Sequence, residues 1–155
     1  MELKTKLHAE DNKQELLVTR EFDLPVELLF RAYTDPEILE QWMGSKVVKL
    51  ENRKHGGWEM EKKDNQGNVL FQANGVIHEF IPNERITRTF EMANVPYGVQ
   101  LEFFEFEKLT EDTSKLKMHI LYRSVEDRNQ MMQIGMPQGM NAAHNYLERV
   151  VSRYK

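Results

Sequence analysis

The feature that most constrains this fold is a long run of alternating apolar and polar residues between Lys46 and Ser124. Short turn-forming segments such as Asp64–Asn68 and Pro82–Glu84 interrupt it. The pattern predicts six strands, at about 46–51, 57–63, 69–81, 85–92, 98–109 and 114–123. Strands joined by such short turns form an antiparallel meander. Residues 16–22 also alternate, so we expect seven strands.

Helical patterns lie on both sides of the meander. Asp23-Leu24-Pro25 ends the first strand, and two short helices are expected before Gly44, the second capped by Asp35 with Pro36 at its first position. After Ser124 the pattern is helical again, and Ser124-x-x-Asp127 resembles a capping box. Pro137 stands where a longer helix can begin. Apolar residues then follow helical spacing at Met136, Met140, Ala143, Leu147, Val150, Val151 and Tyr154.

This order of elements predicts an α+β fold in which a curved, seven-stranded antiparallel sheet wraps around a long C-terminal helix, with two short helices after the first strand. One helix cannot fill the concave side of such a sheet, so we expect a cavity between the two. We expect one domain over residues 1–155, with residues 1–13 forming an N-terminal extension or an extra strand.

Composition and motifs exclude several classes of function. The net charge is −4, which argues against nucleic acid as a partner. The chain has no Cys, and its five His have no ligand spacing, so we expect no metal. No phosphate-binding Gly-Lys-Ser/Thr loop is present, and we expect no cofactor. The N-terminus is charged and no stretch approaches the ~18 apolar residues of a membrane span. We therefore expect a cytoplasmic protein.

Several motifs occur together in an order that is more specific than any one of them. Residues 20–36, with Gln41-Trp42-Met43-Gly44, resemble the opening signature of the SRPBCC (START-like, helix-grip) superfamily. The similarity is strongest to the branch related to the C-terminal domain of the activator of the heat-shock-protein-90 ATPase, and it covers residues 14–155. The other matching motifs are Gly56-Gly57-Trp58, Gly75–Glu79, Pro82–Ile86, Thr89-Phe90, Ser124–Arg128 and Gly135-Met136-x-x-Gly139.

The resemblance implies a helix-grip fold whose hydrophobic cavity binds lipids, polyketides, aromatic compounds or hormones, without implying one activity. Some members of the superfamily are cyclases or hydrolases, some are binding proteins, and a eukaryotic relative is a cochaperone. The chain departs from the family at Met43, where a second Trp is common, and at Met140, where an aromatic residue is common. A flexible thioether at such a position implies a softer and less selective cavity.

We expect the ligand to contact large side chains on the concave side of the sheet and on the last helix. Met side chains there line a deformable cavity or, alternatively, fill an ordinary core. Trp42 forms a lip of the opening or packs beneath it. The candidate ligand-binding residues are Trp42, Trp58, Met60, Phe71, His78, Phe80, Arg88, Phe90, Met118, Tyr122, Met136 and Met140.

Two polar residues are candidates for specific roles. His78 shares parity with Val76 and Phe80, so it is expected to point inward, as a general base or as a structural, hydrogen-bonded histidine. Arg88 shares parity with Ile86 and Phe90. If Arg88 is buried, it needs a carboxylate or an anionic ligand group; alternatively, it does not face inward.

Three further expectations concern the rest of the chain. His144 is expected on the polar, solvated side of the last helix. Phe103-Phe104 places two rings side by side, which indicates a β-bulge. Residues 46–63 carry six Lys or Arg against three Glu, and residues 102–112 carry five acidic side chains against one Lys. These stretches form either solvated surfaces or a docking face for a protein partner.

Our leading hypothesis is binding of a small hydrophobic or aromatic molecule without turnover, since no residues form a recognisable catalytic set. One alternative is a cyclase-, aromatase- or hydrolase-like enzyme that uses His78. Another is a cochaperone-like interaction module that stimulates a chaperone ATPase.

Overall fold

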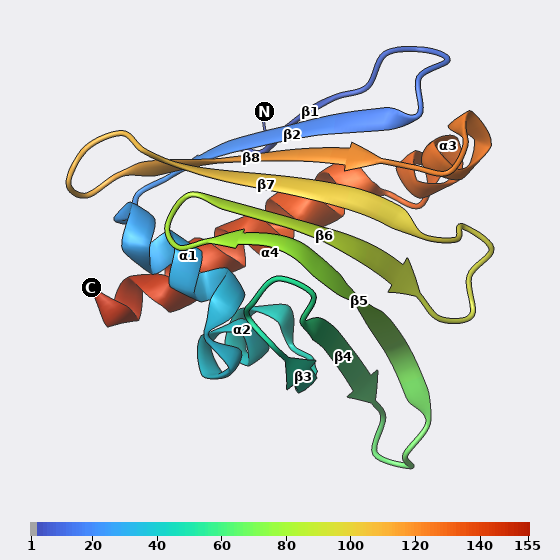
Figure 1. The fold of residues 1–155 in the computed structure, drawn as a ribbon, viewed down its shortest axis with the longest axis horizontal. Helices are drawn as coiled ribbons and strands as arrows, with labels where there is room; N and C mark the ends of the chain where they lie inside the picture. The colour runs from blue at the N-terminus through green and yellow to red at the C-terminus, as the bar shows by residue number, and fades with distance from the viewer. Residues whose placement is uncertain (1–2) are drawn as a thin grey trace.

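The computed structural model describes residues 3–155, over which the chain forms a single antiparallel sheet of eight strands and four α-helices (Figure 1). The sheet order is β1-β2-β8-β7-β6-β5-β4-β3. The strands are β1 (Lys6–His8), β2 (Glu15–Phe22), β3 (Lys46–Leu50), β4 (Gly57–Lys63), β5 (Val69–Ile81), β6 (Arg85–Met92), β7 (Gln100–Lys108) and β8 (Ser114–Leu121). The helices are α1 (Val26–Thr34), α2 (Pro36–Met43), α3 (Val125–Gln133) and α4 (Met136–Val151), with a 3-10 turn at Ser152–Tyr154.

The α+β class, the open antiparallel sheet and the long C-terminal helix are as predicted, but the number of elements is not. The sheet has eight strands, not seven, because Lys6–His8 pairs with β2 along its free edge. There is also a third short helix, α3, which Gly135 separates from α4 by adopting a left-handed backbone conformation with φ +84°.

The helices α1 and α2 close one end of the concave side of the sheet (Figure 1). Asp35 caps α2 through its side chain, which accepts a hydrogen bond from the Glu37 amide at 3.1 Å, and Pro36 occupies the first turn. Trp42 is buried and donates its indole N–H to the Ala32 carbonyl at 2.7 Å. Its ring packs edge-on against Tyr33, so Trp42 belongs to the core beneath the opening and forms no lip.

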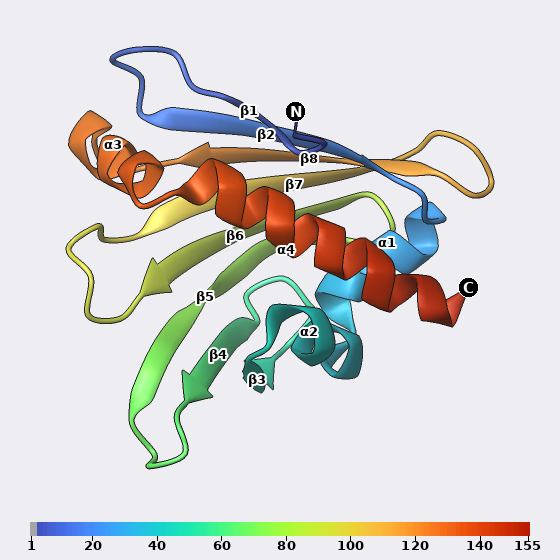
Figure 2. The ribbon, with the colours of Figure 1, turned by 180° about the vertical axis from the view of Figure 1, so that it is seen from behind.

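The helix α4 crosses the concave side of the sheet (Figure 2). Its apolar stripe faces the strands and the helices α1 and α2, which gives the molecule one continuous core. Within residues 3–155, no helix combines the length and apolarity needed to cross a membrane.

Candidate functional site

The burial of α4 changes along its length. In its C-terminal half, Leu147, Val150 and Val151 have almost no exposed surface. In its N-terminal half, Met136 and Met140 face the core but are only partly buried. The helix is therefore tightly packed in its C-terminal half and less completely covered in its N-terminal half.

Large side chains on β5 and β6 show the same partial burial. Phe71 on β5 and Phe90 on β6 pack against the core while keeping some exposed surface, whereas Phe80, at the other end of β5, packs against Phe30 of α1 with ring centres 5.5 Å apart. The side chains of Trp58 and Met60 on β4, of Met118 on β8 and of Tyr122, directly after β8, are buried. We use the name concave groove for the surface that is made of Trp58, Met60, Phe71, Phe90, Met118, Tyr122, Met136 and Met140, all buried or partly buried residues of the core.

Arg88 lies against Trp58, one of the residues of the concave groove. Its Nε donates to Oε1 of Glu102 at 2.9 Å, and Gln100 donates its side-chain amide to Oε2 of Glu102 at 2.9 Å. The guanidinium carbon lies 4.3 Å from the ring centre of Trp58 and 4.9 Å from that of Phe104. Arg88 therefore points to the same side of the sheet as Ile86 and Phe90, as its parity predicts. Its carboxylate partner, Glu102, lies on the neighbouring strand β7.

A further polar group is the hydroxyl of Tyr122, which donates to the sulfur of Met136 at 3.7 Å. Burial raises the pKa of the Tyr122 phenol, and the negative charge of Glu102 raises it further. Tyr122 is thus a neutral hydroxyl at any ordinary pH. It can orient a polar ligand atom, but it does not supply an anionic base.

His78 does not face the groove, so the predicted orientation is wrong. The β5–β6 pairing shifts by one residue between Ile77 and Glu79, and His78 is the extra residue of this bulge. Its side chain is exposed, whereas Ile77 is buried. His78 lies near His55, with ring centres 6.2 Å apart, on the outer surface of the sheet. The enzyme alternative assumed an inward-facing His78, and the structure places this side chain on the outer surface instead.

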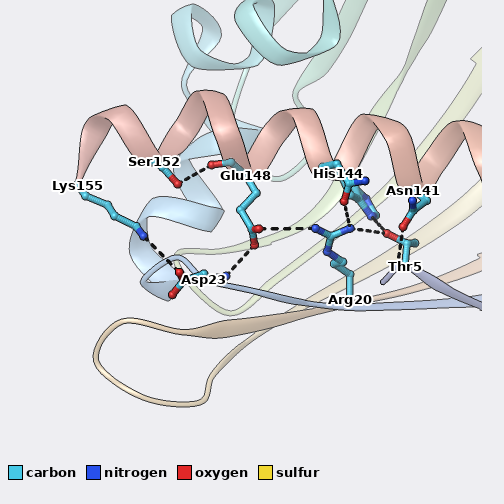
Figure 3. Close-up of polar contacts among 9 residues, drawn as sticks. Thr5, Arg20, Asp23, Asn141, His144, Glu148, Ser152 and Lys155 are labelled. Carbon is cyan, nitrogen blue, oxygen red and sulfur yellow. Dashed lines mark hydrogen bonds and ion pairs between the residues drawn. The ribbon is translucent and has the colours of Figure 1, made fainter. Parts of the chain in front are cut away.

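His144 is also placed differently from the prediction, because it is 3% exposed instead of solvated. It belongs to a polar cluster between α4 and β2 with Thr5, Arg20, Asn145 and Glu148 (Figure 3). Arg20 donates to Asn145 at 2.7 Å and lies 3.8 Å from a carboxylate oxygen of Glu148. Burial, followed by the charge of Arg20, lowers the pKa of His144 to about 3, so the imidazole is neutral.

The expected bulge at Phe103-Phe104 is not present. Pairing between β7 and β8 is regular from Leu101 to Lys108, with Phe104 buried and Phe103 stacked on His119 on the opposite face. Because the pairing is regular, Glu102 points to the same face of the sheet as Phe104. The expected bulge hid this parity, so Glu102 was not predicted as a site residue. The parity of Phe104 and Phe106, two buried rings, is the pattern that points to it.

Two hollows lie at the margins of the sheet, and of the residues of the concave groove only Tyr122 is in their linings. One, of about 450 Å³, lies where β6, β7 and β8 end, and its lining includes Tyr122 with Gly98, Gln100 and Arg123. The other, of about 710 Å³, lies at the edge of β2. Its lining includes Lys4, Lys115, Glu21, Asp23 and Glu148, a charged surface poorly suited to an apolar ligand.

The described part of the chain contains no group of three or more His, Asp or Glu placed to hold a metal ion. The concave groove instead offers a deformable apolar surface with one cation, one buried carboxylate and one phenol. Such an arrangement can enclose an apolar molecule and orient one polar atom of it.

Comparison with known proteins agrees with this architecture. Residues 23–152 match the family model described as "Activator of Hsp90 ATPase homolog 1-like protein". A structure from Rhodobacter sphaeroides is 19% identical with a TM-score of 0.84, covering 96% of this chain and 99% of that one. A structure from Arthrobacter aurescens is 18% identical with a TM-score of 0.83, covering 96% and 91%.

A third structure, of protein Ms6760 from Mycobacterium smegmatis, is 20% identical with a TM-score of 0.81, covering 94% of this chain and 95% of that one. At such identities the similarity shows the fold alone. No curated protein matches the sequence.

Proposed function

The chain belongs to the Activator of Hsp90 ATPase homolog 1-like family, and from this premise we propose that it binds a small apolar or aromatic molecule in the concave groove, without turning it over. The observation that carries the proposal is the change in burial along α4. Met136 and Met140 are only partly covered, although they face the sheet, while Leu147 and Val151 are fully packed. A ligand that covers the open half completes the apolar contacts that the protein leaves unmade.

The residues of the groove suit binding more than catalysis. Thioethers of Met136 and Met140 adapt to ligands of different shape, and the rings of Trp58 and Phe90, with centres 5.6 Å apart, provide a rigid wall. The buried histidine, His144, has its imidazole engaged with Thr5 and lies in the polar cluster between α4 and β2. We therefore assign no general base.

A thermal melt across flavonoids, polyketide-like aromatics, fatty acids and sterols tests the proposal. A ligand at 100 times its Kd stabilises a protein by about 2.7 kcal/mol, which raises Tm by roughly 5–10 °C for a domain of this size. We expect one chemical class to give such a shift. The proposal fails if no class shifts Tm while the protein remains folded.

The cochaperone alternative has its support in the family description rather than in the surface. Several charges of the stretches 46–63 and 102–112 are paired within the chain. Lys49 and Arg53 contact Glu51, and Lys117 contacts Glu105. A complex with a chaperone, and stimulation of its ATPase, is the outcome to look for if no small molecule binds.

A further inference from the structure

Arg88 has a hydrogen-bonding capacity that the protein uses only in part. A guanidinium has five N–H donors. Among the described residues, the bond from Nε to Glu102 is the one hydrogen bond of the Arg88 side chain. One fifth of this side chain is exposed, and its terminal nitrogens are not buried without a partner, as Nε and Nη2 of Arg20 are. The terminal N–H groups of Arg88 therefore remain accessible to solvent or to a ligand.

These donors are held in a fixed orientation. The guanidinium contacts the rings of Trp58 and Phe104, both buried, and is tied to Glu102 at the same time. A side chain fixed in this way loses little conformational freedom when a ligand binds. The donors are thus preorganised toward a polar atom of a molecule that lies against Trp58.

The charge of Arg88 is already compensated. Glu102 is 5% exposed on its side chain and ion-paired with Arg88, while Gln100 occupies its other oxygen. A carboxylate ligand would bring a second anion to one guanidinium. It would lose its hydration on binding, and the neutral Arg88–Glu102 pair would not compensate its charge. A neutral oxygen acceptor would meet the same N–H donors at a much smaller desolvation cost.

We propose that the ligand of the concave groove is a flat apolar molecule with a neutral carbonyl oxygen, such as a ketone, ester, lactone or quinone, which accepts a hydrogen bond from the terminal nitrogens of Arg88. Glu102 then acts as a specificity residue, because its negative charge compensates the positive charge of Arg88. The pair as a whole is neutral, so it donates hydrogen bonds without attracting acids. This inference rests on the proposed function and names the ligand class of the same groove.

Three naphthalenes of similar size test the ligand class on the intact protein. They are 2-acetylnaphthalene, 2-naphthoate and 2-isopropylnaphthalene, and their Kd values are measured by calorimetry or by titration of amide NMR signals. We expect the ketone to bind about 2- to 10-fold more tightly than the hydrocarbon, the range of one net hydrogen bond. We expect naphthoate to bind at least about 10-fold more weakly than the ketone, as for an anion desolvated without a partner.

Two variants and a matched control locate the effect. Glu102→Gln keeps an acceptor for Arg88 but removes the compensating charge, so naphthoate should become the preferred ligand. Arg88→Met should abolish the difference between ketone and hydrocarbon. Glu105→Gln removes a negative charge from the exposed face of the same strand and should leave the ranking unchanged.

The outcomes separate this inference from the proposed function. If all three compounds bind equally, or naphthoate binds best to the unmodified protein, the groove binds ligands and the inference is overturned. If none of the three binds but another class in the thermal panel does, the inference about the ligand class is overturned while the proposed binding function stands. If nothing binds, both fall. The ranking by the unmodified protein decides even if a variant does not fold.

Discussion

Nδ1 of His144 lies 2.8 Å from the hydroxyl oxygen of Thr5, although the two residues are 139 positions apart. The backbone N–H of Thr5 also donates to Asn141 on α4 at 3.0 Å, and Arg20 donates to the same Thr5 hydroxyl at 3.3 Å. The segment before β1 is therefore attached to the middle of α4. This attachment depends on a neutral imidazole, since a protonated His144 would be a second cation beside Arg20.

We expect stability to fall as the pH is lowered from about 6.5 toward 3. The pKa of His144 is about 3 in the folded protein and ordinarily 6.5, so between these values the unfolded chain binds a proton that the folded one does not. Acid therefore favours unfolding, by on the order of 1 kcal/mol per pH unit for this one group. Urea unfolding at pH 7, 6, 5 and 4.5 measures the slope.

The variant His144→Gln keeps hydrogen-bonding atoms but does not titrate, so its stability should depend less on pH. His119→Gln is the control, because His119 is a half-exposed histidine on β8 that contacts Glu15. It should retain the pH dependence of the unmodified protein. Equal slopes for the unmodified protein and His144→Gln would show that His144 is not the responsible group.

We expect one substitution, Gly to Ala, to have opposite effects at two positions. At Gly75, opposite Trp58 in the β4–β5 pair, a Cβ would lie 1.9 Å from the Thr89 carbonyl oxygen and 2.5 Å from the Trp58 indole nitrogen. The hydrogen bond between these two atoms would be disturbed, at a cost of about 1–3 kcal/mol. Gly139→Ala, in an open position on α4, should stabilise by about 0.5–1 kcal/mol.

Thermal melts show whether each substitution raises or lowers Tm. Tryptophan fluorescence reports the environment of Trp58 in Gly75→Ala. A neutral Gly75→Ala would mean that the backbone at Thr89 moves freely, which would contradict the tight packing of β5 against β6. A destabilised Gly139→Ala would mean that the exposed side of α4 is covered.

Most of the sheet could be predicted from sequence because its determinants are local. The alternation of β3 to β8 and turn residues such as Asp64 and Asn83 are visible in single short segments. The strand β1 was missed as a definite element because three residues, Lys6–His8, carry no pattern and are held by pairing with β2. Such non-local pairing leaves no local trace.

The candidate site was harder to predict, because one-residue shifts and distant partners decide it. The bulge between Ile77 and Glu79 moves His78 to the outer surface, although simple parity places it inside. His144 follows Met140 by four positions and precedes Leu147 by three, which puts it on the buried stripe. There its Nδ1 forms a hydrogen bond with the hydroxyl of Thr5, near the other end of the chain.

We expect Arg88 and Glu102 to be strongly coupled in stability. Arg88→Met alone leaves Glu102 buried without its counter-ion, and should cost about 2–4 kcal/mol. The double variant Arg88→Met with Glu102→Gln removes both charges and should recover at least about 1 kcal/mol of this loss. A double-mutant cycle by urea unfolding measures the coupling. Strictly additive losses would show that the two side chains do not form an effective pair.

The last prediction concerns the open half of the concave groove. Met140→Trp places a large ring where α4 faces the sheet without full burial, and should occupy the space that we assign to the ligand. We expect Tm to rise or stay the same, because new apolar surface is buried without displacing a packed side chain, while the ligand-induced rise in Tm disappears. Gln138→Trp adds the same ring at an exposed position of α4 and should leave ligand binding intact. A strong loss of stability in Met140→Trp would contradict an open groove, since it is the expected effect of overpacking a filled core.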